Sequence, residues 1–195
     1  MRLKDIGQHL GKFRVGIAGA GGLGSNCSAV LARAGIGSLV IADFDIVDET
    51  NLSRQYYFPE QAGMPKTEAI RDNLLRIRPG LDVITHNVRL DRENSAGIFK
   101  ECNVIVEALD DSEMKRMFAE TIQLLLPETP LILGSGMAGW GGNNRLRSLR
   151  IDETLYICGD ESSEVSEDRP PLAPRVGIVA CMQANMVVEL LMNLK

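Results

Sequence analysis

A glycine-rich segment near the start of the chain, Gly19 to Gly24, constrains the fold more than any other feature. It follows the apolar run Val15–Ala18, and a second apolar run ends at Asp43. A glycine loop between a buried strand and a helix presents backbone N–H groups and the positive end of the helix dipole to phosphate oxygens. A carboxylate about 20 residues further on commonly accepts hydrogen bonds from a ribose. The order strand, loop, helix, strand and acid therefore predicts a nucleotide-binding site.

The loop supplies four candidate phosphate-binding residues: Gly19, Gly21, Gly22 and Gly24. In such a loop the first glycine lets the chain turn tightly, and the next lets the backbone approach phosphate because no Cβ stands in the way. The last glycine lets the helix pack closely against the strand. Asp43 is the candidate for binding the ribose hydroxyls.

Length and composition limit the classes of protein to consider. The chain has 195 residues, 45% of them hydrophobic, which is enough for one substantial core, so we expect residues 1–195 to form a single domain. The net charge is −5 and the basic residues are dispersed, which argues against a nucleic-acid partner. The N-terminus lacks the apolar core of a signal sequence, and no uninterrupted apolar run is long enough to cross a bilayer. We therefore expect a cytoplasmic protein with no membrane partner.

Apolar runs and helical periodicities alternate along the chain. The predicted strands are 14–18, 38–42, 82–88, 103–108 and 130–134. The predicted helices are 22–34, 66–77, 93–100, 112–126 and 175–194. This alternation predicts an α/β fold, a Rossmann-like doubly wound and mostly parallel sheet. Residues 145–157 alternate apolar and polar positions, which predicts a late antiparallel extension of the sheet.

Three charged residues lie where they can meet a triphosphate. Arg54 is in the long loop after the ribose acid and Lys66 begins the next helix, so both can fold over the site toward the outer phosphates. Asp110 follows a buried strand at the same edge, where its carboxylate suits magnesium bound to phosphates. One of Asp110 and Asp111 can instead cap the following helix. The pattern predicts a triphosphate nucleotide and magnesium as ligands.

These segments occur in an order that resembles a known family. The matching segments are Gly-Ala-Gly-Gly-Leu-Gly-Ser at 19–25, Asp-Phe-Asp at 43–45, Asn-Leu-Ser-Arg-Gln at 51–55, Pro-Lys at 65–66 and Ala-Leu-Asp-Asp at 108–111. They resemble the adenylyltransferases that activate ubiquitin-like sulfur carrier proteins, the ThiF, MoeB and HesA group. The resemblance extends over nearly the whole chain.

The resemblance implies a reaction and a role for each site residue. The carrier's C-terminal glycine carboxylate attacks the α-phosphorus of ATP and forms an acyl-adenylate and pyrophosphate. The glycines hold phosphates, Asp43 the ribose and Asp110 magnesium. Asn51, Arg54 and Lys66 contact the phosphate chain, and Gln55 is a further candidate for the same site. The catalytic residues are then Arg54, Lys66 and Asp110. Family members often take an arginine from the partner subunit's N-terminal segment, and here neither Arg2 nor Arg14 is assigned that role.

The cysteines depart from the family's pattern. Many relatives bind structural zinc through two CxxC pairs, and this chain has neither pair, so we expect no zinc. Cys158 matches one cysteine of such a pair and is a remnant or a free thiol. Cys27 and Cys181 are predicted to be buried in helices. The loop before the last helix lacks the cysteine that forms a covalent link in some relatives, so we expect adenylation without such a link.

A basic residue after Asp110 and a glycine-rich segment are further candidates for the site. Lys115 or Arg116 stands near where relatives place a basic residue after the metal aspartate. Ser135 to Gly142 either lines a groove for the carrier tail, since glycine permits close backbone approach, or is a turn between strands.

The sequence-based interpretation is a homodimeric enzyme that adenylates a small ubiquitin-fold carrier protein ending in Gly-Gly, in thiamine biosynthesis. The alternatives are the adenylation of another carboxylate, on a molybdopterin carrier or on tRNA threonylcarbamoyladenosine. A nicotinamide-dependent oxidoreductase and a non-catalytic nucleotide-binding scaffold also stay open. The dispersed basic charge counts against the tRNA substrate.

Overall fold

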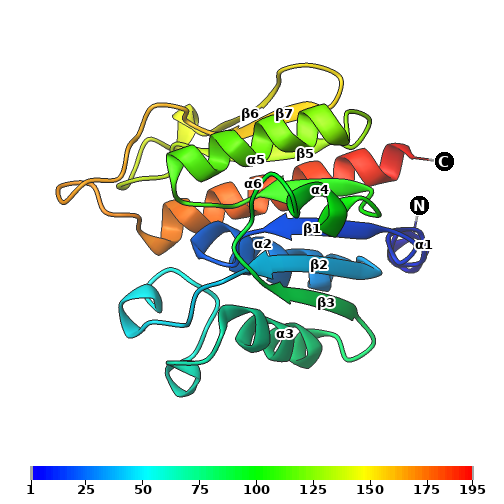
Figure 1. Cartoon of the computed structure of the whole chain (residues 1–195), viewed down its shortest axis with the longest axis horizontal. Coiled ribbons are helices and arrows are strands. Elements are labelled where there is room, and N and C mark those ends of the chain that lie inside the picture. Colours follow the sequence, from blue (N-terminus) through cyan, green and yellow to red (C-terminus); the bar gives the residue numbers. More distant parts are fainter. Residues whose placement is uncertain (1, 195) are drawn as a thin grey trace.

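The centre of the protein is a seven-stranded sheet in the order β3-β2-β1-β4-β5-β7-β6 (Figure 1), seen in a computed structural model that describes residues 2–194. The strands are β1 Arg14–Ala18, β2 Ser38–Asp43, β3 Asp82–Asn87, β4 Val104–Glu107, β5 Leu131–Ser135, β6 Arg147–Arg150 and β7 Leu155–Gly159. Neighbouring strands are parallel except for the antiparallel pair of β6 and β7. This confirms the α/β, mostly parallel Rossmann-like sheet with a late antiparallel extension.

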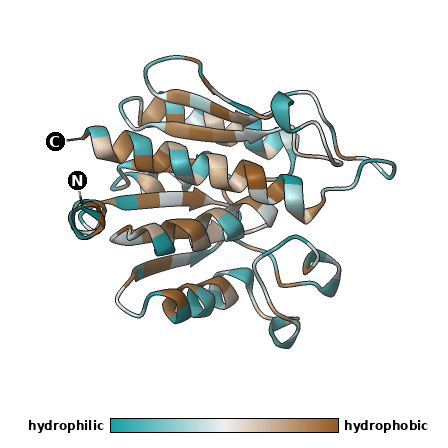
Figure 2. Cartoon of the chain, turned by 180° about the vertical axis from the view of Figure 1, so that it is seen from behind, coloured by the Kyte–Doolittle hydropathy of each residue, from teal (hydrophilic) through white to brown (hydrophobic). Residues whose placement is uncertain are grey.

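The central strands β1, β2 and β4 are apolar because both of their faces are covered. The helices are α1 Leu3–Leu10, α2 Gly22–Ala34, α3 Lys66–Ile77, α4 Ser95–Phe99, α5 Ser112–Leu125 and α6 Ala173–Asn193, and α2 to α6 cover the two faces. Side chains of α2, α3 and α6 pack in one core, and those of α4 and α5 pack in a second core across the sheet. Seen from behind, α6 and α2 lie side by side over the strands (Figure 2).

The order of the strands reverses next to β1, since β2 and β4 lie on its two sides. Ligands of open α/β sheets bind at this position, outside the carboxyl ends of the strands. The long segment 44–64 also lies at this edge, at the left of Figure 1, and contains the 3₁₀ helices Glu49–Asn51 and Pro59–Gln61. The chain termini lie at the opposite side of the molecule.

Two elements differ from the sequence-based prediction. The helix predicted over 93–100 is the shorter α4. The residues before it form an Asx turn instead, in which Asp91 Oδ1 accepts hydrogen bonds from the N–H groups of Glu93 and Asn94. α6 is long and apolar enough to span a membrane by length and composition, although no uninterrupted apolar run predicts this. Its residues Val179, Val187 and Leu191 are buried in the core, so the apolar composition of α6 serves its packing against the sheet.

Candidate nucleotide-binding site

The glycine loop joins β1 to α2 at the carboxyl edge of the sheet, and its close packing depends on Gly24. A Cβ on Gly24 would lie 1.8 Å from the carbonyl oxygen of Gly19. Gly19 has a φ of 96°, in the left-handed region that favours glycine. Its missing Cβ would lie 2.7 Å from the carbonyl oxygen of Ala108, in the loop after β4. Two glycines therefore bring the loops after β1 and β4 into direct contact.

Asp43, the last residue of β2, is hydrogen-bonded to this loop. Its Oδ2 accepts a 2.6 Å hydrogen bond from the Ala20 N–H, and its Oδ1 accepts one of 2.8 Å from the Asp45 N–H. The residue is only 9% exposed, and burial raises the pKa of its carboxyl, against which the Ala20 hydrogen bond and the nearby Lys66 act. The predicted ribose acid and the predicted phosphate loop thus form one rigid unit.

Asn51, Arg54 and Gln55 form a second unit beside the loop. The Asn51 Oδ1 accepts hydrogen bonds from Arg54 Nη2 and Gln55 Nε2, both 3.0 Å long. Asn26 of α2 anchors this cluster, because its Nδ2 donates to the backbone oxygens of both Gly22 and Arg54. The structure therefore brings together three residues that the sequence motif predicted.

Gln55 carries an unused hydrogen-bond acceptor. Its Oε1 is buried and has no hydrogen-bond partner within residues 2–194. Gln55 Nε2 is 3.9 Å from where a Cβ on Gly21 would lie, so the amide borders the glycine loop. A buried acceptor without a donor is costly, and a ligand hydroxyl of the kind that a ribose carries would satisfy it. The residues at this edge fit a nucleotide.

Lys66 begins α3 and points back toward the end of β2. Its ammonium lies 2.8 Å from Asp45 Oδ2, and its side chain is only 7% exposed. The Tyr57 hydroxyl, which donates to the Ala20 carbonyl oxygen at 2.7 Å, joins the same region to the glycine loop. Lys66 is therefore a buried, paired cation at the predicted site and not a lysine of the helix surface.

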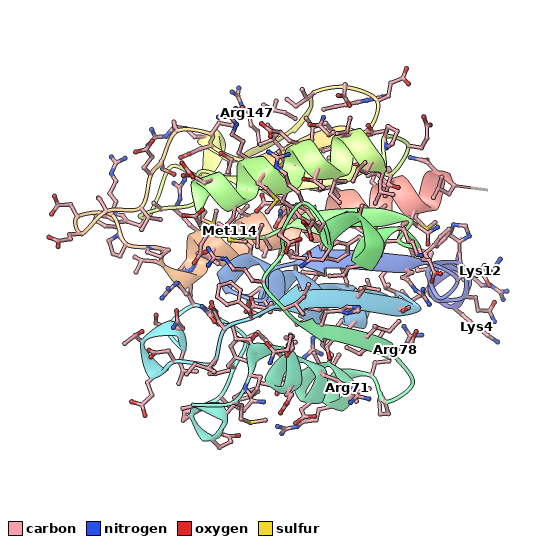
Figure 3. All side chains as sticks on the ribbon, viewed as in Figure 1. Lys4, Lys12, Arg71, Arg78, Met114 and Arg147 are labelled. Carbon is pink, nitrogen blue, oxygen red and sulfur yellow. The ribbon has the colours of Figure 1, made fainter. Side chains whose placement is uncertain are left out.

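The two aspartates after β4 have different roles in the structure. Asp111 caps α5, because its Oδ1 accepts a 2.8 Å hydrogen bond from the N–H of Met114, labelled near the start of that helix in Figure 3. Asp110 is exposed, and its carboxylate takes part in no hydrogen bond within the described part of the chain. The capping alternative therefore applies to Asp111 and leaves Asp110 free.

The surroundings of Asp110 offer few protein ligands to a metal. No group of three or more His, Cys, Asp or Glu side chains converges within residues 2–194. A metal held by Asp110 would take its other ligands from phosphate oxygens and water, which is how proteins commonly bind magnesium.

Sequence reasoning missed Glu107, which contacts Lys115. Glu107 ends β4 and is fully buried, and the Lys115 ammonium lies 2.8 Å from each of its carboxylate oxygens. Burial raises the pKa of Glu107, against which Lys115 acts. A carboxylate next to the apolar run 104–106 was the available signal. Arg116, the alternative to Lys115, pairs with the exposed Glu120 on the α5 surface instead.

The segment 136–142 is held against the loop 159–172. Arg175, at the start of α6, donates a 2.7 Å hydrogen bond to the Gly141 carbonyl oxygen and pairs with Asp160 at 2.7 Å. The Gly139 N–H donates to Pro170 O, so this segment, for which a groove lining and a turn were both left open, is packed along a second loop. Both side chains of the ion pair are nearly inaccessible, at 4% and 3% exposure.

We expect Asp160→Asn to destabilise the protein by about 3 kcal/mol at pH 7, because it leaves Arg175 buried without a counter-charge. Burial alone would raise the pKa of Asp160, but N–H groups of Ser163 and Ser162 and the Arg175 guanidinium bring it below 3.8. A pKa lowered by folding gives stability that is present above pH 3.8 and is lost as the pH falls toward the folded-state pKa. Urea unfolding from pH 7 to pH 2 should therefore show the two proteins converging, and a constant difference would contradict this.

The structure corrects one prediction about the cysteines. Cys181 was predicted to be buried, but it lies on the exposed face of α6. Cys27, Cys102 and Cys158 are buried, and burial raises the pKa of the Cys158 thiol, which lowers its thiolate fraction.

Among the described residues, neither of the two N-terminal arginines is paired with a residue of the candidate site. Arg2 pairs with Asp5 at the start of α1, and Arg14 pairs with Glu101 at the amino end of β1.

Comparison with known proteins identifies relatives over almost the whole sequence. The ThiF family model matches residues 3–195. The adenylyltransferase and sulfurtransferase of Caenorhabditis briggsae is 32% identical over 89% of this chain and 44% of its own length. The molybdopterin-synthase adenylyltransferase of Salmonella typhimurium is 29% identical over 91% of this chain and 72% of its own length. That of Haemophilus influenzae is 30% identical, over 89% and 72%. This chain thus spans less than half of the first relative.

The same fold occurs in a solved structure with bound nucleotide. The tRNA N6-threonylcarbamoyladenosine dehydratase of Escherichia coli, in complex with ATP, superimposes with a TM-score of 0.87. The alignment covers 97% of this chain and 89% of that one, at 17% identity. The shared feature is the fold.

Proposed function

This chain belongs to the ThiF family, and from that premise we propose that it is an ATP-dependent adenylyltransferase. The observation that carries the proposal is the assembly of a glycine loop, a ribose-type carboxylate, two cations and a free aspartate at one sheet edge. Arg54 and Lys66 exceed what a nicotinamide dinucleotide requires, because that cofactor has no terminal phosphates. The relatives named adenylyltransferases support the same activity.

In the proposed reaction a substrate carboxylate attacks the α-phosphorus of ATP. The new bond joins the carboxylate oxygen to that phosphorus, and the bond to the bridging oxygen breaks, so pyrophosphate leaves. Magnesium, when bound, would neutralise part of the charge on the phosphates, and Asp110 would hold it. The glycine loop and the α2 N-terminus would hold the phosphates, with Arg54 and Lys66 facing the leaving group. Catalysis is then positioning and charge neutralisation, and no protein nucleophile is needed.

We propose a small ubiquitin-fold carrier protein ending in Gly-Gly as the substrate, and the sulfur carrier of thiamine biosynthesis as the carrier. The family resemblance is the support for both the class of carrier and the pathway. The carrier of molybdopterin synthesis is the competing substrate, since two of the relatives are named molybdopterin-synthase adenylyltransferases.

The test is magnesium-dependent ATP–pyrophosphate exchange, with the Gly-Gly-tailed carriers of the same organism supplied one at a time. Exchange that requires one carrier would support adenylation and identify the partner. Tight ATP binding without exchange by any carrier would contradict the proposal.

Arg54→Ala is expected to weaken ATP binding about tenfold and leave AMP binding unchanged, because Arg54 is proposed to face the outer phosphates. Titration calorimetry with each nucleotide measures both. Arg71→Ala is the matched control, since Arg71 is an exposed arginine of α3 (Figure 3) and should affect neither nucleotide. Equal losses of ATP and AMP affinity in Arg54→Ala would contradict the assignment.

We also propose that the protein is a cytoplasmic homodimer, on the strength of the family resemblance. Sedimentation equilibrium tests the oligomeric state, and a monomer at working concentrations of substrate and enzyme would overturn the proposed homodimer.

A further inference from the structure

We propose that Glu107 and Lys115 are a positioning ion pair that holds the loop carrying Asp110 in the geometry needed to bind magnesium. The inference rests on the proposed function, because it assumes that Asp110 binds a metal. It adds two residues to the site through contacts that join the end of β4 to the first turns of α5.

The pair closes the loop between β4 and α5 at two points. The Glu107 Oε1 accepts a 2.7 Å hydrogen bond from the Leu109 N–H, while the Lys115 ammonium donates to the Leu109 carbonyl oxygen at 2.9 Å. Both backbone groups of Leu109 are thus fixed by the pair. On the other side of Asp110, the capping hydrogen bond fixes Asp111 to α5.

Asp110 therefore lies between two immobilised residues while its own carboxylate stays free. An exposed aspartate on a flexible loop would lose conformational entropy on binding a metal ion, and a pre-positioned one loses less. Displacements of about 1 Å are enough to impair catalysis.

Glu107 is itself fixed from the opposite face of the sheet. Gln183 of α6 donates from Nε2 to the Glu107 backbone oxygen at 2.9 Å. Replacing such a buried pair by apolar residues of similar size is often neutral or stabilising, so stability alone does not explain why a charged pair stands here. A role in placing Asp110 does.

The experiment must separate positioning from stability, so the readout is the effect of magnesium on ATP affinity. Titration calorimetry gives the ATP dissociation constant with magnesium and with EDTA, and their ratio is the magnesium enhancement. Groups that orient metal ligands typically contribute about 10- to 100-fold to metal affinity. We expect Glu107→Gln and Lys115→Met to lower the enhancement about tenfold, with ATP affinity in EDTA within about twofold of wild type. Lys115→Arg keeps the positive charge and should retain most of the wild-type magnesium enhancement.

Two further variants make the outcome decisive. Asp160→Asn breaks the Arg175 ion pair, in which both side chains are buried, and should leave the enhancement unchanged, although it destabilises the fold. Asp110→Ala is the benchmark for complete loss of the metal ligand. If Lys115→Met does not fold, the double variant Glu107→Gln/Lys115→Met, which leaves no unpaired charge, replaces it.

The results distinguish this inference from the proposed function. An unchanged enhancement in Asp110→Ala would overturn the metal role of Asp110 and, with it, the inference. Loss in Asp110→Ala, with wild-type enhancement in Glu107→Gln and Lys115→Met, would overturn the positioning role alone. An equal loss in Asp160→Asn would also overturn it, because general destabilisation would then explain the effect.

Discussion

Asp110→Ala is expected to lower the rate of carrier-dependent ATP–pyrophosphate exchange about a thousandfold, because it removes the protein's ligand to the metal that neutralises the phosphates. The fold should stay intact, since Asp110 is exposed and its carboxylate makes no hydrogen bond within residues 2–194. Exchange rates at saturating ATP, together with the circular dichroism spectrum and urea midpoint of the variant, measure the two effects separately.

The neighbouring aspartate provides the control. Asp111→Asn also removes one negative charge, at the adjacent residue, but keeps the side-chain oxygen that caps α5. We expect exchange within about threefold of wild type for this variant. Full activity in Asp110→Ala with loss in Asp111→Asn would show that the two roles are reversed.

Gly24→Ala is expected to destabilise the protein by about 4 kcal/mol and to abolish ATP binding. The new Cβ would lie 1.8 Å from the carbonyl oxygen of Gly19, so either the loop or α2 must move. Gly19 and Gly24 both lie against Ala108, so neither segment can shift without displacing the loop after β4. Urea unfolding and ATP titration measure the two losses.

Gly97→Ala is the matched control, because Gly97 is also helical and, apart from its chain neighbours and its own helix backbone, no atom lies within 4 Å of the added Cβ. This variant should be as stable as wild type or about 0.5–1 kcal/mol more stable. Wild-type stability and ATP affinity in Gly24→Ala would contradict the account of the loop.

The sequence predicted the parts of the structure that depend on local patterns. The helix predicted over 22–34 is α2, and Gly35 caps it with a φ of 103°, where glycine is favoured. The order of strands and helices followed from apolar runs and helical spacing, because buried parallel strands are continuously apolar. The residues of the motif 51–55 were expected to share a site, and the structure places their side chains in contact.

What the sequence did not predict are contacts between distant positions. Lys66 reaches Asp45, and Arg175 reaches Asp160, because elements far apart in the chain meet at the sheet edge. No spacing rule encodes such pairs. The exposure of Cys181 was also missed, since α6 is apolar over most of its surface and periodicity does not show which face packs.

The central claim is that a carboxylate is activated at the α-phosphorus, and the products of a trapping reaction test it most directly. The enzyme is incubated with magnesium, ATP, its carrier and hydroxylamine, which converts an activated carboxyl to a hydroxamate. We expect AMP and carrier hydroxamate in equal amounts, measured by chromatography and intact-protein mass. ADP and phosphate with the same hydroxamate would place the attack at the γ-phosphorus and contradict the account.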